Sequence, residues 1–377
     1  MRKAVREYLG LTDTEKQELL KRALIVLDTN VLLNLYRFSK STRDALLDAM
    51  RTYEKQLWMP YQIAIEFMRK RPKIIDESVK KYDSLITSGN GFVEKCIKEL
   101  RINPNDKACV ELKDYITSWI EDKKQGDLLV TSWNDDSILS QILELYDGKV
   151  GKAYSDIELE GIKKEGKLRY DKKIPPGYKD SNKITENSDN NAFGDLIYWK
   201  QILDYAKETA SDVILVTGDK KEDWWAKTED KRIIGPRPEL IKEFIDITSK
   251  TIYMYDMNQF IQFAGKELDE SVVDEIQSIS MDEENQELIQ EDVLQSYNAI
   301  HEEIIALEEK NANRLSSIKG YERLINNGTA TNSQIFHYHS TVESYKREKK
   351  QIKQLKEQLR MLPIPDEVAK GLYWLTR

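Results

Sequence analysis

The sequence predicts an α/β fold in which a central parallel sheet is flanked by helices, with a helical insertion and a C-terminal helical hairpin or coiled coil. Two short runs of aliphatic and β-branched residues, 23–27 and 213–217, are bounded by turn-forming residues, as buried parallel strands usually are. Heptad spacing of apolar residues near the C-terminus predicts the hairpin. We therefore expect a sheet domain over 1–265, interrupted by a helical insertion at 73–134, and a helical region over 266–377.

The first part of the expected sheet domain contains helices and one further strand. Thr12 followed by Glu15 is a capping-box pattern for the first helix, and Ser41 or Thr42 can open the second. Pro72 is expected to end or kink the third helix, because proline disfavours helical backbone at the residue before it. The expected helices cover 12–22, 41–53 and Pro60 to about Arg71, and a short strand covers 57–59.

The insertion is expected to hold about three helices, because its helical periodicity is broken by SGNG and by NPND. The pattern of the sheet domain resumes at Asp135. Residues 171–191 are rich in Pro, Gly, Asn and Asp, and a loop of this length inside a compact domain is usually functional or disordered. A strand over 252–255 and a helix over 256–264 complete the domain.

Two heptad runs predict the C-terminal hairpin. Apolar residues recur from Val293 to Ile325 and again from Ile335 to Leu359, and Asn-Asn-Gly at 326–328 separates the runs. Acidic residues dominate the first arm and basic residues the second, so antiparallel arms would attract each other. The acidic stretch after Gly265 is expected to be a linker or mobile surface. We expect the hairpin to mediate homo-oligomerisation or contact with a protein partner.

Composition excludes several kinds of site and of protein. The three histidines, His301, His337 and His339, all follow residue 300, which excludes a histidine-based zinc site or a Ser-His-Asp triad before them. Cys96 and Cys109 have no C-x-x-C partners, so no disulfide framework is indicated. The N-terminus lacks a signal-peptide pattern, and no apolar run is long enough to span a membrane. We expect a cytoplasmic protein with no membrane partner.

Four acidic residues occupy positions from which they can converge. Asp28 follows the first strand and Asp219 follows the run at 213–217, while Glu66 and Asp195 lie on expected helices. Ligands of open α/β sheets bind in the crevice at the carboxyl ends of the strands. Clustered carboxylates repel one another unless a cation neutralises them, and hard oxygen ligands suit Mg²⁺ or Mn²⁺.

Several motifs resemble those of the PIN domain, a metal-dependent nuclease fold. They are DTNVLL at 28–33, the proline-to-glutamate spacing from Pro60 to Glu66, GDLIYW at 194–199 and VTGDKKEDWW at 216–225. The additional blocks PPGYKD at 175–180 and GPRPELIKEF at 235–244 resemble one bacterial PIN-like subfamily. The resemblance covers roughly residues 20–70 and 135–265. It implies a Mg²⁺- or Mn²⁺-dependent endonuclease, and we expect RNA to be its substrate.

The resemblance also implies roles for individual residues. Asp28 would be the central metal ligand, Asp195 and Asp219 would complete the site, and Glu66 would hold a metal or its water. Asn30 and Thr217 would orient these ligands. Asp223 and Asp180 are additional candidate carboxylates, and three lysines could bind phosphate as point charges: Lys179, Lys220 and Lys221.

Other functions fit parts of the pattern. A toxin or defence role follows only by analogy with the fold, and structure-specific DNA cleavage is a close variant. A phosphatase of the haloacid dehalogenase type would need D-x-D, and position 30 is Asn. A non-enzymatic interaction module remains a third class. In structural terms, Asp28 could simply cap the element after its strand, and Trp224 with Trp225 would pack against the sheet.

Overall fold

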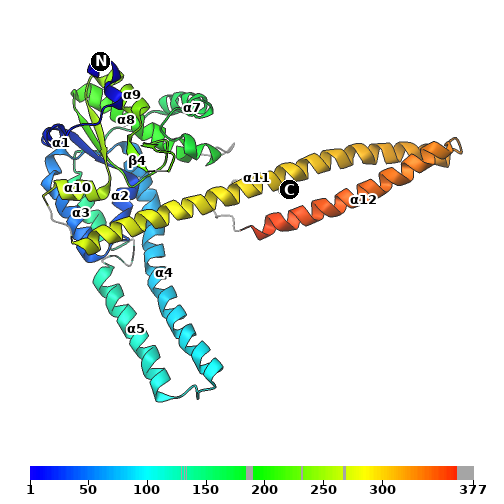
Figure 1. The fold of residues 1–377 in the computed structure, drawn as a ribbon, viewed down its shortest axis with the longest axis horizontal. Coiled ribbons are helices and arrows are strands. Elements are labelled where there is room, and N and C mark those ends of the chain that lie inside the picture. The colour runs from blue at the N-terminus through cyan, green and yellow to red at the C-terminus, as the bar shows by residue number, and fades with distance from the viewer. Residues whose placement is uncertain are drawn as a thin grey trace. The chain divides into compact units, whose positions relative to one another are not determined.

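The computed structural model describes residues 1–362 except 129, 131, 133, 184–189, 231 and 266–268. The chain divides into two compact units, Met1–Met281 and Asp282–Arg377. Figure 1 shows the sheet and most of the helices in the first unit, and a long helical hairpin in the second. Among the described residues, no helix combines the length and the apolar character needed to cross a membrane.

A three-stranded parallel sheet forms the centre of the first unit, as predicted. Its strands lie in the order β1 (Leu24–Leu27), β2 (Val213–Val216) and β5 (Ile252–Tyr255). Leu27 is paired with Val216, and Val216 with Tyr255, so the three strands end at the same level. The expected strand at 57–59 is reduced to isolated bridges, in which Leu57 pairs with Ile25 and Met59 with Val150. All four residues of β2 are buried, because helices cover both faces of the sheet.

The helices around the sheet follow local signals in part. Thr12 and Glu15 form the predicted capping box of α1. Helix α3 begins at Lys40, one residue before the expected opening. Helix α8 is buried on most of its surface, and its Tyr198 and Trp199 are almost inaccessible to solvent. The flanking helices are α1 (Asp13–Leu20), α2 (Thr29–Asn34), α3 (Lys40–Thr52), α6 (Ser137–Leu145), α7 (Asp156–Asp171), α8 (Gly194–Thr209), α9 (Pro238–Thr248) and α10 (Met257–Phe263).

The insertion is a two-helix hairpin, not the three helices expected. Helix α4 runs without interruption from Tyr61 to Leu100, and α5 spans Lys107–Asp127. The helix was expected to end or kink at Pro72. It continues because Arg71, Ile74 and Ile75 are buried at this level, so tertiary packing outweighs the local cost of proline.

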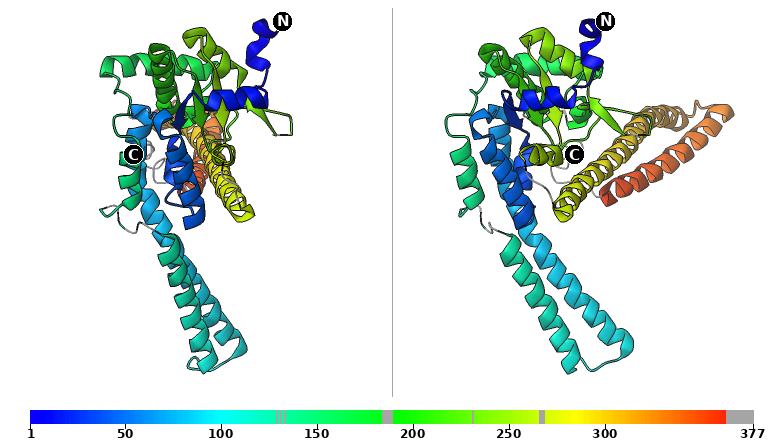
Figure 2. Two further views of the ribbon diagram at one scale, coloured as in Figure 1. Left: turned by 90° about the vertical axis from the view of Figure 1, so that its left-hand side faces the viewer. Right: turned by 60° about the vertical axis from the view of Figure 1, so that its left-hand side comes forward.

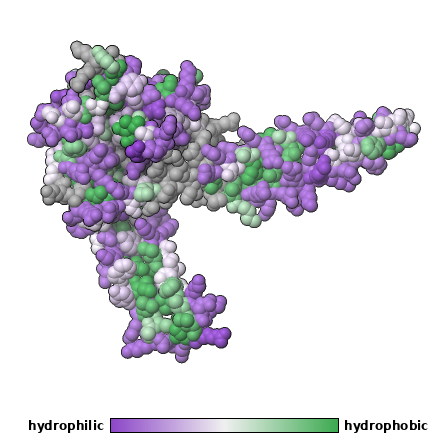
Figure 3. Space-filling model, viewed as in Figure 1, coloured by the Kyte–Doolittle hydropathy of each residue, from purple (hydrophilic) through white to green (hydrophobic). Residues whose placement is uncertain are grey.

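The SGNG segment does not break α4 either. A Cβ added at Gly89 would lie 2.7 Å from Ile116 Cγ2, so this glycine lets α5 approach closely. Only the NPND segment separates helices, as predicted. Figure 2 shows α4 and α5 side by side in both views, and Figure 3 shows apolar residues exposed over this hairpin.

The segment between α7 and α8, expected as a loop, contains two short 3₁₀ helices, Tyr178–Lys183 and Asn190–Phe193. The middle of the loop, 184–189, lies outside the described residues. After β2, strands β3 (Trp225–Lys227) and β4 (Ile233–Pro236) form an antiparallel pair that the sequence did not predict. Trp224 and Trp225 are buried, as expected for packing residues.

The acidic stretch after Gly265 is not a linker from Glu270 onward, because helix α11 (Glu270–Asn326) begins there. Val272 and Ile276 on its first turns belong to the core of the first unit. Glu275 accepts hydrogen bonds from the Ser39 amide and hydroxyl, both at 2.6 Å, and from the Thr42 hydroxyl. The first unit therefore extends through the beginning of α11.

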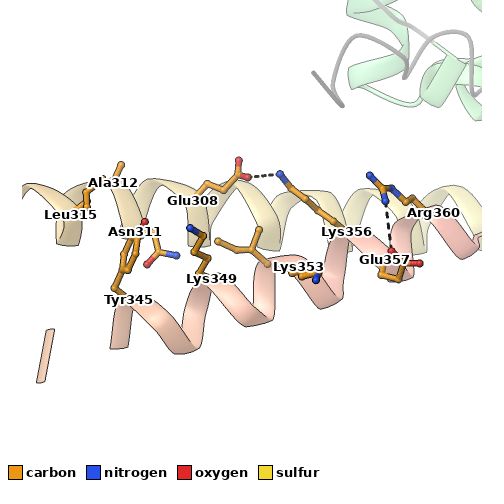
Figure 4. A pocket seen from close by; sticks show the side chains of 11 residues that line it. Glu308, Asn311, Ala312, Leu315, Tyr345, Lys349, Lys353, Lys356, Glu357 and Arg360 are labelled. Atoms are coloured by element: carbon orange, nitrogen blue, oxygen red, sulfur yellow. Dashed lines mark ion pairs between the residues drawn. The ribbon is translucent and has the colours of Figure 1, made fainter. Parts of the chain in front are cut away.

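In the second unit, α11 turns at Gly328 into α12 (Asn332–Met361), which confirms the two predicted helices. Tyr297, Ile304 and Leu359 form an apolar cluster between them. Lys356 on the basic arm pairs with Glu308 on the acidic arm at 2.7 Å, as the charge pattern predicted. Figure 4 shows a groove between the helices with this pair at its edge. Residues 363–377 of the expected C-terminal region lie outside the described part.

Candidate active site

Asp28 stands directly after β1 and is buried, with 7% of its surface exposed. It is the N-cap of α2: its Oδ1 accepts a hydrogen bond from the Thr29 amide at 2.6 Å. Its Oδ2 accepts one from the Thr217 hydroxyl at 2.8 Å. Leu27 of β1 pairs with Val216 of β2, so the residues that follow them, Asp28 and Thr217, lie side by side. Asp28 thus caps α2 and lies at the carboxyl ends of β1 and β2.

The surroundings of Asp28 disfavour its charged form. Burial raises the pKa of Asp28 to about 7, although the hydroxyl of Thr217 lowers it. The negative charges of Asp219 and Glu66 raise the pKa further. These two acids therefore lie within electrostatic range of Asp28.

Glu66 lies on the second turn of α4 and reaches toward α2 and α8. Its Oε2 accepts a hydrogen bond from the Thr29 hydroxyl at 3.4 Å, and its Oε1 lies 2.5 Å from Lys70 Nζ. A Cβ built on Gly194 would lie 3.8 Å from Glu66 Oε2, so the carboxylate reaches the start of α8. Burial alone would lower the pKa of Lys70, but the charges of neighbouring carboxylates, Glu66 foremost, raise it overall.

Asp195 is the second residue of α8, next to Gly194. Its Oδ2 accepts a hydrogen bond from Trp224 Nε1 at 3.2 Å. Burial raises the pKa of Asp195 well above its usual range, and the charge of Asp180 adds to the rise, while Lys221 opposes it. Gly177, with φ of +86°, brings its backbone close to Asp195: a Cβ there would lie 3.1 Å from the Asp195 Cβ. The PPGYKD segment thus covers the start of α8.

Asp219 lies in the turn after β2 and is held by its own neighbours. Its amide donates to the Thr217 hydroxyl at 3.0 Å, and its Oδ1 accepts from the Lys221 amide at 2.7 Å. Lys221 Nζ lies 3.3 Å from Asp219 Oδ2 and 3.6 Å from Asp180 Oδ1. Lys221 therefore joins two of the predicted acids, and Asp180 lies at the edge of the cluster.

Asp223 anchors the loop that approaches Asp195. Its Oδ2 accepts hydrogen bonds from the amides of Gly177 at 3.1 Å and Lys179 at 3.2 Å, whereas its buried Oδ1 has no partner among the described residues. Burial raises the pKa of Asp223 to about 6, and the charge of Asp219 adds to this. The segment from Asp219 to Asp223 forms a turn before β3, not the start of a helix.

The remaining candidates lie near the cluster with different partners. Lys179 Nζ lies 3.6 Å from Glu222, which is outside the predicted set. The side chain of Asn30, on α2, makes no hydrogen bond to the four acids within the described residues. Lys220 is partly buried in the turn between Asp219 and Lys221.

The charges of all four predicted acids act on one buried hydroxyl, that of Tyr198. This residue lies on α8, is 1% exposed and stacks on Trp224 with ring centroids 5.5 Å apart. Its hydroxyl has no hydrogen-bond partner in the described part of the chain. Burial raises the pKa of Tyr198, and four negative charges raise it further: those of Asp28, Asp195, Asp219 and Glu66.

The chemistry of this cluster fits a hard divalent cation. All four acids offer oxygen ligands, and burial together with neighbouring negative charges raises the pKa of Asp28 and of Asp195. Among the described residues, however, no three His, Cys, Asp or Glu side chains are close enough to form a metal-binding group. Two lysines instead neutralise part of the cluster: Lys70 on Glu66 and Lys221 on Asp219.

Three residues near the acids had no role predicted from the sequence: Lys70, Tyr198 and Thr29. Lys70 follows Glu66 by four residues on one helix, a spacing that brings side chains together, so it could have been found. Thr29 lies in the DTN motif itself. Tyr198 gave no signal, because a tyrosine on an apolar helix is usually a packing residue.

Comparison with known proteins gives one match. A family model described as "PIN like domain" matches residues 24–240, which is more than half of the chain and includes all four acids. No curated protein and no solved structure matches the chain. PIN domains are in general metal-dependent nucleases, so the match indicates a nuclease-type function with a nucleic acid substrate. This chain belongs to the PIN-like domain family.

Proposed function

We propose that the protein is a Mg²⁺- or Mn²⁺-dependent endonuclease that hydrolyses phosphodiester bonds in RNA. The observation that supports this most directly is that Thr217 hydrogen-bonds to both Asp28 and Asp219, while Thr29 hydrogen-bonds to both Asp28 and Glu66. The four acids come from four separate segments of the chain, and Asp28 and Asp219 each follow a strand of the parallel sheet. Packing alone does not require four acids there, and their mutual repulsion opposes folding.

Each acid has a role that follows from its surroundings. Asp28 lies deepest and would be the central ligand, because Thr29 and Thr217 hold both of its oxygens in fixed positions. Glu66, Asp195 and Asp219 would complete the site. A bound divalent cation would neutralise charge on the phosphate and lower the pKa of water, so that hydroxide forms near neutral pH.

The lysines bring positive charge to the same place. Lys70 and Lys221 each pair with one of the acids, so their ammonium groups lie beside the proposed metal site. As compact point charges on flexible stems, they can hold phosphate oxygens of the substrate. Thr29 and Thr217 orient the carboxylates through hydrogen bonds, as outer partners of metal ligands commonly do.

The test is cleavage of end-labelled RNA and DNA panels, single-stranded, duplex and flapped, by purified protein in Mg²⁺, Mn²⁺ or EDTA. We expect RNA cleavage in Mg²⁺ or Mn²⁺ and none in EDTA. Thermal melting with and without Mn²⁺ gives a readout independent of activity, because a ligand that binds only the folded state raises the melting temperature. Preference for flapped DNA would replace RNA as the substrate. Neither cleavage nor a melting shift would leave an interaction module on a nuclease fold.

A further inference from the structure

A small pocket lies beside the acid cluster, between α4, α7 and α8. Its volume is about 130 Å³. Helix α4 contributes Tyr61, Gln62, Ile65 and Arg69, which recur at the spacing of one helix face. Helices α4 and α8 also carry Glu66 and Asp195, so the pocket and the acids are built on the same two helices.

The pocket and the acid cluster meet at Gly194. A Cβ added there would lie 3.6 Å from Gln62 Nε2 and 3.8 Å from Glu66 Oε2. The Gln62 amide and the Glu66 carboxylate, one helical turn apart, therefore reach the same point at the start of α8. If a molecule fills the pocket, the part of that molecule that extends past Gly194 would lie at the acid cluster.

The lining combines apolar walls with a few polar groups. Ile65 and Ile197 face the pocket together with Leu159 of α7, and Tyr61 offers a partly exposed aromatic ring, 37% accessible. This mixture is typical of small-molecule subsites, in which a few polar groups fix the orientation of a flat apolar ligand.

Two glutamines differ in how fully they are used. Gln201 is 6% exposed. Its side chain accepts a hydrogen bond from the backbone amide of Gln62 at 3.0 Å and donates one to the Lys152 carbonyl at 3.3 Å. Its position is therefore fixed. The side-chain amide of Gln62 has no hydrogen-bond partner in the described part of the chain, and Arg69, which is exposed, has no ion-pair partner there. At the rim of the pocket, the Gln62 side chain can therefore donate and accept hydrogen bonds, and the Arg69 guanidinium supplies a positive charge.

We propose that this pocket receives one unpaired base of a single-stranded nucleic acid whose scissile phosphate lies at the acid cluster. Tyr61 would stack on the base, Gln62 would contact its edge, and Arg69 would hold a neighbouring phosphate. The pocket has the volume of roughly four water molecules, which suits one base and not a base pair. A base inside a duplex cannot reach such a pocket without leaving its stack. This inference rests on the proposed nuclease function.

The experiment measures binding of a fluorescent single-stranded oligonucleotide in EDTA, where cleavage is absent. We expect Tyr61→Ala to weaken binding at least about fivefold, the loss expected for one base stacked on an aromatic ring. Tyr61→Phe, which keeps the ring, should bind like the wild type. Arg69→Ala should weaken binding most at low salt. Matched controls are Tyr115→Ala and Lys98→Ala, both exposed on the α4–α5 hairpin.

Abasic substitutions make the test specific to the pocket. An oligonucleotide with one abasic position at the correct site should bind the wild type as weakly as the intact strand binds Tyr61→Ala, and the two changes together should cost no more than either alone. RNA and DNA strands of one sequence show which backbone the site prefers. Equal affinity of the wild type and Tyr61→Ala for single strands, or equal binding of duplex and single strand, would overturn the proposal.

The pocket and the nuclease function can fail separately. If the wild type cleaves nucleic acid but Tyr61→Ala changes neither KM nor binding, the pocket assignment is wrong and the nuclease function stands. If single strands bind in a Tyr61-dependent way but no metal supports cleavage, the pocket assignment stands and the nuclease function is wrong.

Discussion

Two carboxylates in this protein, the partly buried Glu243 on α9 and the buried Asp28 after β1, have opposite electrostatic surroundings. Glu243 accepts two hydrogen bonds from the Arg169 guanidinium, at 2.6 and 2.8 Å, and one from Trp199 Nε1 at 2.9 Å. Burial would raise the pKa of Glu243, but the bonds from Arg169 outweigh it and lower the pKa. The Arg169 guanidinium therefore supplies the positive charge that balances the Glu243 carboxylate.

Among the described residues, Asp28 accepts hydrogen bonds from two neutral groups, the Thr29 amide and the Thr217 hydroxyl, while burial and the charges of Asp219 and Glu66 oppose its ionisation. Its pKa is accordingly raised to about 7. The two surroundings distinguish an acid that the protein neutralises itself, Glu243, from an acid that a bound ligand can neutralise, Asp28. An acid paired with an internal guanidinium is satisfied, whereas a cluster short of positive charge can gain it from a bound cation.

The largest effect that we expect is the loss of activity in Asp28→Asn. The substitution keeps the size of the side chain and removes the charge that would hold the cation. Loss of an outer partner of a metal ligand typically costs 10- to 100-fold, so loss of the central ligand should lower kcat/KM by more than about 100-fold. Unchanged turnover in this variant, with EDTA still abolishing activity, would contradict the assignment of Asp28.

The same chemical change at Glu243 should act on stability alone. Glu243→Gln leaves the mostly buried Arg169 without its main counter-charge, and we expect the unfolding free energy to fall by about 2 kcal/mol. Urea denaturation of wild type, Glu243→Gln and Asp28→Asn in EDTA measures this directly. Asp28→Asn should be as stable as the wild type or more stable. Equal losses of unfolding free energy in Glu243→Gln and Asp28→Asn would contradict the distinction between the two sites.

The pH dependence of stability should separate the two acids by sign. Asp28 has a folded-state pKa of about 7, above the ordinary value of 3.8, so the stability of metal-free wild type should fall as pH rises between these values. The advantage of Asp28→Asn should thus be absent near pH 4 and largest above pH 7, at less than about 4 kcal/mol. The pKa of Glu243 is lowered, so its contribution is present above 4.5 and is lost as pH falls further. An advantage of Asp28→Asn that is independent of pH would refute this account.

Asp223 tests the boundary between the two kinds of acid, since one of its oxygens is used by the protein and the other is not. Asp223→Ala should destabilise the protein by about 1–3 kcal/mol, because the amides of Gly177 and Lys179 lose their acceptor. Asp223→Asn retains an acceptor, so it should be more stable than Asp223→Ala while binding Mn²⁺ more weakly than the wild type. Normal Mn²⁺ affinity in Asp223→Asn would make the residue a loop anchor only.

The smallest effect should come from removing the second unit. A chain ending at Met281 keeps Val272, Glu275 and Ile276 and should melt within a few degrees of the full-length protein. A chain ending at Gly265 loses these contacts, and burial of each large aliphatic side chain contributes about 1.5–3 kcal/mol. Light scattering of the full-length protein and the Met281 chain tests whether the hairpin mediates self-association. Equal stability of the two truncations would show that the start of α11 is dispensable.

Much of the sheet domain could be predicted from the sequence because its signals are local. The apolar runs at β1 and β2 and the capping box at Thr12 act over a few residues, and the structure follows them. Pro72 and the SGNG segment misled the prediction of α4, because burial around Arg71 and the contact of Gly89 with Ile116 come from elements distant in sequence. The β3–β4 pair depends on contacts of the same non-local kind.

The sequence motifs indicated the acids of the site, whereas the ion pairs of Glu66 with Lys70 and of Asp219 with Lys221 were not predicted. The sequence places Asp28 and Asp219 after strands, and the structure brings them within electrostatic range. The spacing from Glu66 to Lys70 could have predicted their ion pair. By contrast, the anchoring of Asp223 by the amides of Gly177 and Lys179 depends on the path of a loop 44 to 46 residues away, which no local pattern indicates.

Titration calorimetry with Mn²⁺ tests whether the four acids bind a divalent cation. Metal-free wild type, Asp28→Asn and Glu243→Gln would be titrated at pH 7.5, above the raised pKa of Asp28. We expect saturable binding to the wild type, the same affinity in Glu243→Gln and strongly weakened binding in Asp28→Asn. Absence of binding to the wild type, or equal binding by all three proteins, would show that the four acids do not form a cation site.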